Sequence, residues 1–358
     1  MTFLILVLAT GCVARTPAPD ALQQRVDTAL RDNPSCVALA LVVIREGDVL
    51  GVAAGPASPG GPAFTIHTPL RIASNTKTYV AAATLRLAAR GDVDLDASIS
   101  SALDPRLLAP LQDAGYAIDD ITIRQLLMHS AGLRDHADEE YVARVMGEAS
   151  RVWTPEEQVA IAAAKGAPLG APGAIHRYSD TGYVLLGCIL ERATGTTLAT
   201  VVRDELDFEG LGLQATWWEI SEHSPHGIPA RATQFLEGHA IDGIHGSADA
   251  FGGGGLMASV ADMAQFTDAL FGGRVFDHEA TLALMRDAPG QPDPERYRMG
   301  VSRWILADHE AFGHSGFWGT IALHVPGLDV TIAAAVLDPA GFDVMVDLVA
   351  ETVKTLSE

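Results

Sequence analysis

The chain contains the stretch Arg71-Ile72-Ala73-Ser74-Asn75-Thr76-Lys77-Thr78-Tyr79, which leads into a run over residues 80–90 typical of a helix that ends at Gly91. Positions three apart share a helix face, so the amine of Lys77 is expected beside the hydroxyl of Ser74. A serine becomes a strong nucleophile when a neighbouring base takes its proton, and a lysine of lowered pKa can be that base. The alternative is a helix-capping serine followed by a surface lysine.

The usage of cationic residues supports the nucleophile. Lysine and arginine together number 24, but the only lysines are at positions 77, 165 and 354. Arginine does not lose its proton in a protein. A lysine therefore stands where a titratable amine is needed, in a chain that otherwise uses arginine.

Strand patterns lie towards both ends of the chain, and helical patterns lie between them. Residues 37–44 and 49–54 predict a hairpin, and 297–306, 313–325 and 330–337 predict further strands. Capping boxes at Thr122 and Thr154, a helix over 181–194 and a helix start at Ser259 fill the middle, and helices are also predicted over 21–31 and 342–356. We expect an α/β fold (α+β) built from both termini, about 21–91 and 250–358, with a mostly helical insert at about 92–249.

The N-terminus predicts export. Residues 1–11 form an apolar run too short to span a bilayer, and Leu8-Ala9-Thr10-Gly11-Cys12 resembles a bacterial lipobox. We expect a signal peptide over 1–11, lipidation of Cys12, a tether over 12–20 and a periplasmic or cell-surface lipoprotein anchored to a membrane. A buried N-terminal strand is the alternative. Export would permit a disulfide between Cys36 and Cys188, although two free thiols are the favoured interpretation.

Charge and spacing exclude other classes. The net charge of −21 and the pI near 4.8 argue against nucleic acid and anionic membrane surfaces as partners. No Cys/His spacing resembles a zinc site. Four histidines fall in a loop-rich region, where solvated side chains are favoured over a metal site: His223, His226, His239 and His245.

Two further segments carry candidate site residues. Tyr178-Ser179-Asp180 precedes the helix over 181–194, and its alternative interpretation is a core tyrosine followed by a helix cap. Gly313-His314-Ser315-Gly316-Phe317-Trp318-Gly319 lies in a strand pattern and is not a hydrolase nucleophile elbow, because Phe317 stands where a glycine is needed. It predicts a sheet edge that a substrate backbone can approach. The run 252–255 is four glycines without a phosphate-loop lysine, so a turn is expected.

Together these segments resemble the penicillin-recognising serine hydrolases: class C β-lactamases, D-alanyl-D-alanine carboxypeptidases and related esterases and D-aminopeptidases. Ser74 and Lys77 match the SxxK motif of that family. Residues 178–180 stand where the family has Tyr-x-Asn, and residues 314–316 stand where β-lactamases have Lys-Thr-Gly and some carboxypeptidases and D-aminopeptidases have His-x-Gly. The stretches 121–133 and 252–259 also look like family segments. The resemblance runs from about residue 21 to the C-terminus and implies an antiparallel sheet flanked by helices.

The resemblance also implies a mechanism. Ser74 would attack a carbonyl to form an acyl-enzyme, while Lys77 and Tyr178 share the proton transfers. The backbone N–H groups of Ser74 and Phe317 would form the oxyanion hole, and His314, Ser315 and Gly316 would bind the carboxylate of a substrate. The substrate would be a small molecule or peptide, and no metal or cofactor is needed.

Two departures from the family pattern change the expectation. Asp180 replaces an asparagine, and its carboxylate favours a protonated Lys77, so Tyr178 becomes the expected general base. The Asp180 carboxylate could also suit a substrate that carries an amine. His314 replaces a lysine, and a histidine partly charged near neutral pH would bind carboxylates less well as pH rises.

Three hypotheses follow from the sequence. The leading one is an acyl-enzyme hydrolase of D-alanyl peptides or small esters and amides. The second is a true β-lactamase. The third is a non-catalytic penicillin-binding or sensor protein, because a Lys77–Asp180 ion pair could disable the base.

Overall fold

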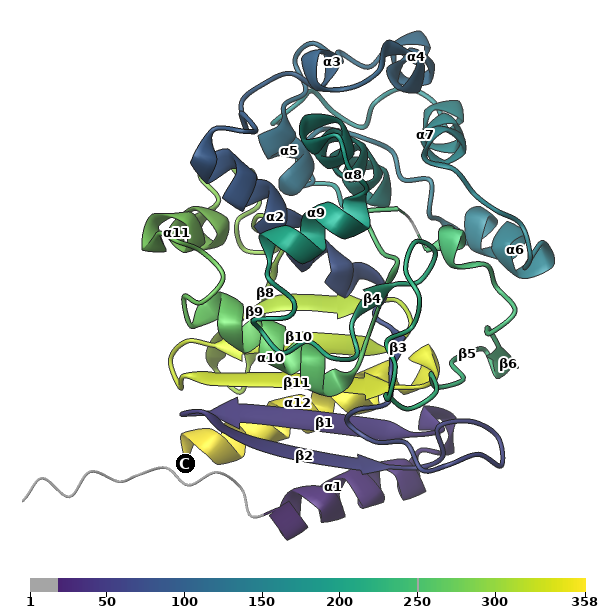
Figure 1. Cartoon of the computed structure of the whole chain (residues 1–358), viewed down its shortest axis with the longest axis vertical. Helices are drawn as coiled ribbons and strands as arrows, with labels where there is room; N and C mark the ends of the chain where they lie inside the picture. Colours follow the sequence, from purple (N-terminus) through teal and green to yellow (C-terminus); the bar gives the residue numbers. More distant parts are fainter. Residues whose placement is uncertain (1–18, 250) are drawn as a thin grey trace, which may run out of the picture.

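The computed structural model describes residues 19–249 and 251–358 (Figure 1). The predicted signal peptide and Cys12 lie outside these residues. Helix α1 (Pro19–Asp32) includes the last two residues of the tether predicted over 12–20. Proline is well suited to a first helical turn, where its missing N–H would have no intrahelical partner.

One six-stranded sheet unites the two ends of the chain, in the order β2-β1-β11-β10-β9-β8 (Figure 1). Every neighbouring pair is antiparallel, and β1 joins the two halves by pairing with β11. The predicted sheet of both termini, flanked by helices, is confirmed. The strands are β1 (Leu39–Arg45), β2 (Asp48–Ala54), β8 (Ser302–Leu306), β9 (His309–Gly316), β10 (Thr320–Val325) and β11 (Val330–Val336).

Turns set the limits of these strands. The predicted hairpin is confirmed, and its two-residue turn places Glu46 at φ 52° and Gly47 at φ 85°, the positive values that a tight hairpin requires. The strand predicted over 297–306 begins only at Ser302, because Gly300 at φ 77° interrupts the extended chain. The run predicted over 313–325 is two strands, separated by a turn that includes Gly319 at φ 89°.

Helices cover both faces of the sheet. Helices α1 and α12 (Phe342–Ser357) pack on one face, and α10 (Val260–Phe271) packs on the other. Alternate residues of β1 therefore enter two different cores: Leu39 and Leu41 face α1 and α12, while Ala40 and Val42 face α10. This double burial explains why β1 is apolar at successive positions rather than at every second one.

The remaining helices form the upper part of the molecule in Figure 1. Capping boxes at Thr122 and Thr154 are present as predicted, and α2 ends at Gly91 with φ 83°. No single described helix is long and apolar enough to cross a bilayer, although α8 and α9, bent by 79°, pass that test as a pair on length and composition alone. The helices are α2 (Thr76–Arg90), α3 (Ile99–Ala102), α4 (Pro105–Asp113), α5 (Ile123–Leu127), α6 (Glu139–Gly147), α7 (Pro155–Ala164), α8 (Asp180–Thr194), α9 (Leu198–Glu205) and α11 (Glu279–Asp287).

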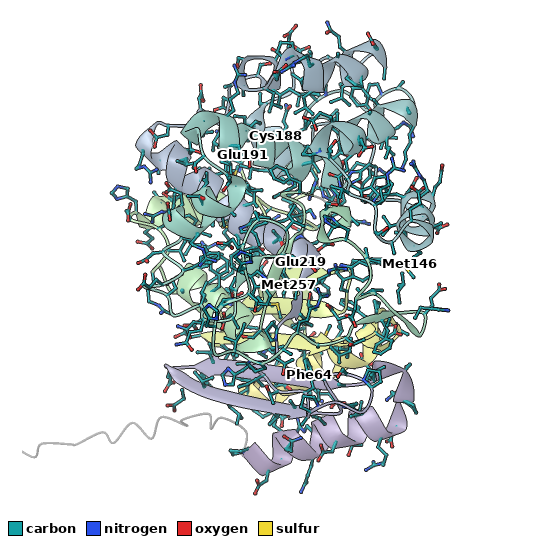
Figure 2. The ribbon with its side chains drawn as sticks, turned by 45° about the vertical axis from the view of Figure 1, so that its right-hand side comes forward. Phe64, Met146, Cys188, Glu191, Glu219 and Met257 are labelled. Atoms are coloured by element: carbon teal, nitrogen blue, oxygen red, sulfur yellow. The ribbon has the colours of Figure 1, made fainter. Side chains whose placement is uncertain are left out.

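The segment between α9 and β7 differs from the predicted helical pattern. Its described residues are mostly irregular, with a 3₁₀ turn at Gly246–Ala248 and three short strands: β4 (Trp217–Trp218), β5 (Phe235–Leu236) and β6 (His239–Ala240). β4 pairs with β7 (Leu256–Ala258), which pairs with β3 (Leu70–Arg71). Strand β3 of this small sheet ends at Arg71, three residues before Ser74. Figure 2 labels Glu219 and Met257, which belong to the β4 and β7 side of the sheet, close together.

The two described cysteines are free, as the favoured interpretation predicted. Cys36 is buried against Gly341 in the layer of α1 and α12. Cys188 belongs to α8 in the upper helical part, where Figure 2 labels it. The two thiols therefore lie in different layers.

An ion pair fixes the segment before Ser74. Arg71 is 1% exposed, and its Nε and Nη2 donate to the two carboxylate oxygens of Glu219 at 2.7 and 2.9 Å. Nη2 also donates to the carbonyl of Ile244. One guanidinium thus joins β3 to two points of the irregular segment.

We predict that Arg71→Ala lowers the free energy of unfolding by about 3–5 kcal/mol, because it leaves the Glu219 carboxylate buried without its main partner. Urea denaturation would measure the loss. Arg106→Ala is the matched control, since Arg106 pairs with Asp104 at the surface, and it should leave the midpoint unchanged. Equal stability of Arg71→Ala and wild type would contradict the anchoring role.

Candidate functional site

The hydroxyl of Ser74 and the amine of Lys77 are in contact. Ser74 lies in the short 3₁₀ turn Ala73–Asn75, and Lys77 lies in the first turn of α2. Lys77 Nζ is 2.8 Å from Ser74 Oγ. The spacing of three residues thus produces the contact that the sequence predicted.

Lys77 is fully buried, and its ammonium is saturated with acceptors. Besides Ser74 Oγ, Nζ donates to the carbonyl of Gly253 at 2.6 Å and to the carboxylate of Asp180. Burial lowers the pKa of Lys77, but Asp180 and Tyr178 more than offset it and hold the pKa above its usual value. Lys77 is therefore a cation with all three N–H groups engaged, and it is not poised to accept a proton.

Tyr178 lies beside this pair. Its ring centroid is 5.1 Å from Lys77 Nζ. Burial raises the pKa of Tyr178 to about 12, while its contacts with Lys77 and Ser74 act in the opposite direction. The ring also packs on His129, whose Nδ1 accepts the backbone N–H of Ser179. The structure thus brings together Ser74, Lys77, Tyr178 and Asp180.

The sequence did not identify a second carboxylate, that of Asp135. Its Oδ1 accepts the backbone N–H groups of Asp180 at 3.0 Å and Ala137 at 3.2 Å. Burial and the charge of Asp180 raise the pKa of Asp135 to about 7. Asp135 therefore holds the start of α8, and with it Asp180, in place; no motif marks it in the sequence.

Strand β9 brings its C-terminal end against the Ser74 turn. A Cβ on Gly316 would lie 2.2 Å from the carbonyl oxygen of Ile72, so only glycine allows this approach. Asn75 Nδ2 donates to Thr320 Oγ1 at 2.9 Å and ties the turn to β10 as well. The C-terminal end of β9 and the candidate nucleophile are therefore held in direct contact. The edge strand is β8 rather than β9, but its pairing with β9 ends at Gly313, so residues 314–316 extend past it.

His314 does not match the expected partly charged histidine. Burial and the nearby charge of Lys77 lower the pKa of His314 to about 3. The imidazole is 4% exposed and both of its nitrogens have partners within the protein. The expectation that His314 is partly protonated near neutral pH is wrong, because the sequence does not reveal that this side chain is buried.

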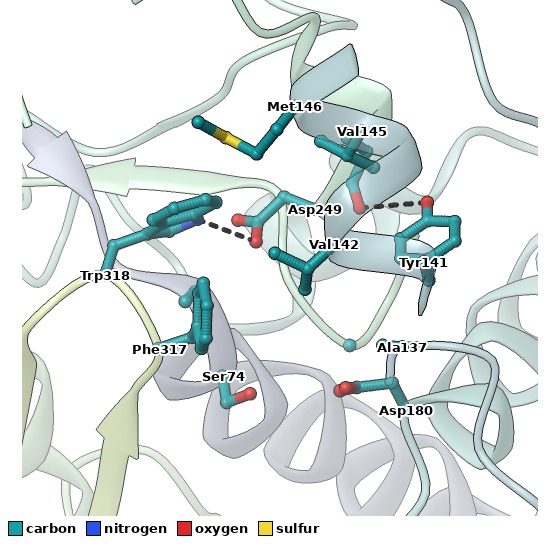
Figure 3. A pocket seen from close by; sticks show the side chains of 13 residues that line it. Ser74, Ala137, Tyr141, Val142, Val145, Met146, Asp180, Asp249, Phe317 and Trp318 are labelled. Atoms are coloured by element: carbon teal, nitrogen blue, oxygen red, sulfur yellow. Dashed lines mark hydrogen bonds between the residues drawn. The ribbon is translucent and has the colours of Figure 1, made fainter. Parts of the chain in front are cut away.

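A pocket of about 630 Å³ opens above Ser74 (Figure 3). Helix α6 supplies one apolar wall, and Phe317 and Trp318 supply the other. Asp180 faces Ser74 from the α8 side, and Asp249 accepts the indole N–H of Trp318 at 3.0 Å. Thirteen residues line the pocket: Ala73, Ser74, Ala137, Tyr141, Val142, Val145, Met146, Asp180, Ala248, Asp249, Gly253, Phe317 and Trp318.

The arrangement suits acyl transfer. Ser74 and Phe317, whose backbone N–H groups are the expected oxyanion donors, both line the pocket. Ser315 is half-buried on β9 beside them. Within residues 19–249 and 251–358, no cluster of three or more His, Cys, Asp or Glu side chains is placed to hold a metal ion.

Comparisons with known proteins agree with this geometry. The family model described as Beta-lactamase matches residues 23–348. Esterase EstB of Burkholderia gladioli is 29% identical over 350 residues, covering 87% of each chain. N-acetylmuramyl-L-alanine amidase of Bacillus subtilis is 26% identical over 340 residues, covering 82% of this chain and 75% of its own. The crystal structure of D-amino acid amidase from Ochrobactrum anthropi, complexed with L-phenylalanine amide, superposes with a TM-score of 0.76 at 24% identity, covering 95% of this chain and 99% of its own, which concerns the fold.

Proposed function

Since the chain belongs to the β-lactamase family of hydrolases, we propose that it is a serine hydrolase that forms an acyl-enzyme on Ser74. The substrates are small esters or amides with an apolar acyl group. D-alanyl peptides, the other class expected from the sequence, carry a carboxylate on the leaving group, for which the pocket lining offers neither lysine nor arginine. The observation that carries the proposal is the hydrogen bond from the Lys77 ammonium to Ser74 at the floor of an apolar pocket. Similarity to an esterase and to an amidase supports both kinds of substrate, esters with an alcohol leaving group and amides with an amine leaving group.

The proposed reaction uses a tyrosine base and a lysine cation. Ser74 Oγ attacks the carbonyl carbon and its proton moves to the Tyr178 phenolate. The hydrogen bond from Lys77 stabilises negative charge on Oγ during the attack. Tyr178 then protonates the leaving group as the tetrahedral intermediate collapses, and water releases the acyl group by the same path.

The backbone of the pocket would stabilise the oxyanion. The N–H groups of Ser74 and Phe317 are the proposed donors, and a donor of this kind is typically worth about 3–4 kcal/mol in the transition state. Because these donors belong to the Ser74 turn and to the segment that follows β9, which Gly316 holds together, their spacing is set by the fold.

One observation bears on each of the β-lactamase and sensor alternatives. A β-lactamase is disfavoured, because it needs a partner for the carboxylate of its substrate and His314 is neutral and buried. A non-catalytic protein is favoured by the ion pair that holds Lys77 protonated. If Tyr178 is the base, a permanently protonated Lys77 does not prevent catalysis, because Lys77 then acts only as a cation.

We predict that the full chain is labelled once by a fluorophosphonate and that Ser74→Ala abolishes both the label and ester hydrolysis. Intact-protein mass spectrometry and turnover of p-nitrophenyl esters measure the two effects. Ser101→Ala, a surface serine, should behave as wild type. Benzylpenicillin is tested in parallel, with loss of free drug followed: fast drug loss supports the β-lactamase. A folded wild-type protein with no adduct and no turnover supports the sensor.

A second prediction concerns pH. The phenolate fraction of a tyrosine with a pKa of about 12 rises about tenfold per pH unit below that value, so kcat/KM should increase with pH through the neutral and alkaline range. Asp180 raises the pKa of Tyr178, so Asp180→Asn should shift the profile to lower pH and increase kcat/KM at pH 7 by about threefold to tenfold.

The control for this profile is Asp343→Asn, an exposed carboxylate at the start of α12, which should not shift it. A profile of Asp180→Asn with the wild-type position and a uniformly lower rate would contradict the Tyr178 base. It would show that the carboxylate itself takes part in the chemistry.

A further inference from the structure

One of the three lysines of the chain has no part in the proposed reaction. Lys77 lies beside Ser74, and Lys354 is exposed on the last helix, α12. Lys165 is the C-cap residue of helix α7, and its side chain is 21% exposed. Apart from these three residues, arginine supplies the cations of the chain. A lysine at position 165 therefore requires a physical reason.

The ammonium of Lys165 is surrounded by three acceptors from one loop, residues 135–138. Nζ donates to the carbonyl oxygens of Asp135 at 2.8 Å and His136 at 2.9 Å, and it lies 2.5 Å from the carboxylate of Asp138. An ammonium directs three N–H groups from one point, whereas the donors of a guanidinium lie in a flat fork. A lysine therefore suits acceptors that converge on one point better than an arginine does.

The 135–138 loop also holds the first turn of α8. Asp135 Oδ1 accepts the backbone N–H of Asp180 at 3.0 Å. The backbone N–H of His136 donates to Thr181 Oγ1 at 3.1 Å, and the ring Nδ1 of His136 lies 3.0 Å from the same oxygen. Both of these side chains are fully buried. The two residues whose carbonyls bind the ammonium are therefore the two that hold the start of α8.

Asp180 connects this arrangement to the nucleophile. Its carboxylate accepts a hydrogen bond from Lys77 Nζ, which is 2.8 Å from Ser74 Oγ. Because Lys77 is 0% exposed, water cannot replace an acceptor that moves away. A series of direct contacts therefore runs from the Lys165 ammonium to the reacting hydroxyl, and a shift at the start of α8 would displace Lys77.

We propose that Lys165 is a positioning residue of the site. Its ammonium fixes the 135–138 loop against α8, so that Asp180 meets the ammonium of Lys77 in the geometry that acylation needs. Lys165 does not line the pocket, so it acts through the loop rather than on the substrate. The inference rests on the proposed function and deepens it with a residue that no motif marks.

The loop has a second contact with the pocket, and its effect on the kinetics is different. Asp138 caps α6 by accepting the backbone N–H of Tyr141 at 3.1 Å, and α6 forms an apolar wall. Disorder of this wall would weaken the binding of the acyl group and raise KM, whereas a displaced Asp180 would slow the reaction of bound substrate and lower kcat. The split between kcat and KM therefore distinguishes the two effects.

Lys165→Met keeps the length of the side chain and removes its charge. With p-nitrophenyl esters, kcat per site labelled by a fluorophosphonate should fall about tenfold to a hundredfold, because a misplacement of about 1 Å suffices for such a loss. KM should stay close to the wild-type value. Lys354→Met, at an exposed position on α12, should behave as wild type. A wild-type kcat per labelled site in Lys165→Met, or a loss confined to KM, would overturn the proposal.

Lys165→Arg carries the test if the methionine variant does not fold. It keeps a cation near the loop, but its flat fork cannot meet three acceptors that converge on one point. Its kcat per labelled site should still fall, by about threefold to tenfold, the size of one hydrogen bond. A wild-type kcat in this variant would contradict the proposal, because the loop would then not depend on the ammonium.

A double-mutant cycle tests whether Lys165 acts through Asp180. Once Asp180→Ala has removed the carboxylate, Lys165 has nothing left to position, so adding Lys165→Met should lower kcat by less than about twofold. Losses that multiply in full would show that Lys165 acts elsewhere, against the proposal. Asp180→Asn does not serve here, because its amide oxygen can still accept from Lys77.

The ammonium groups themselves give a readout that needs no substrate. In protein labelled with ¹⁵N on lysine, Lys77 and Lys165 should give slowly exchanging signals because their N–H groups are engaged, and exposed Lys354 should not. In Lys165→Met, the signal of Lys77 should shift or broaden as Asp180 moves, and an unchanged signal would overturn the proposal. If the wild type takes no label and hydrolyses no ester, the proposed function fails, whereas this spectrum still decides the role of Lys165.

Discussion

The arrangement around Ser74 depends on the buried ammonium of Lys77. A buried ion that lacks partners costs several kcal/mol, so its surroundings must supply acceptors. Lys77 finds them in three segments that are distant in sequence: Ser74 before α2, Asp180 at the start of α8 and the carbonyl of Gly253. One charge thereby holds the sheet-side turn against the helical part, which is where the pocket opens.

This assembly requires backbone to approach backbone closely, and glycines permit it. Gly252, at φ 77°, would place a Cβ 2.2 Å from the carbonyl oxygen of Tyr183, so the loop that carries Gly253 reaches α8 only without a side chain there. Gly316 plays the same part between β9 and Ile72. The glycine run that the sequence presented as a turn is thus what delivers an acceptor to Lys77.

Features that depend on near neighbours were predictable from the sequence. The Ser74–Lys77 contact follows from helical spacing, and the capping boxes and the hairpin turn at Glu46 follow from local hydrogen bonds and φ values. Asp180 also raises the pKa of Lys77, as expected, because a carboxylate in contact with an ammonium favours its charged form.

Features that depend on burial or on distant contacts were not predictable. The neutral state of His314 arises from burial beside Lys77, and the raised pKa of Tyr178 arises from burial that exceeds the effect of the neighbouring cation. Asp135 and Tyr297 lie in segments without a motif, and each makes its contact only when the chain brings it to a partner from another element.

We infer from three observations that anions bind poorly in this pocket. At long range, a net charge of −21 repels them in solution. Within the pocket, the thirteen lining residues include two aspartates, Asp180 and Asp249, and neither lysine nor arginine. At contact range, the ammonium of Lys77 is saturated and the imidazole of His314 is occupied by Tyr297. An anion entering this pocket would lose its hydration without gaining a partner, whereas an apolar acyl group would gain about 25 cal/mol for each Å² buried on the walls of α6 and Trp318. What the pocket excludes therefore follows from the same buried charge that organises its nucleophile.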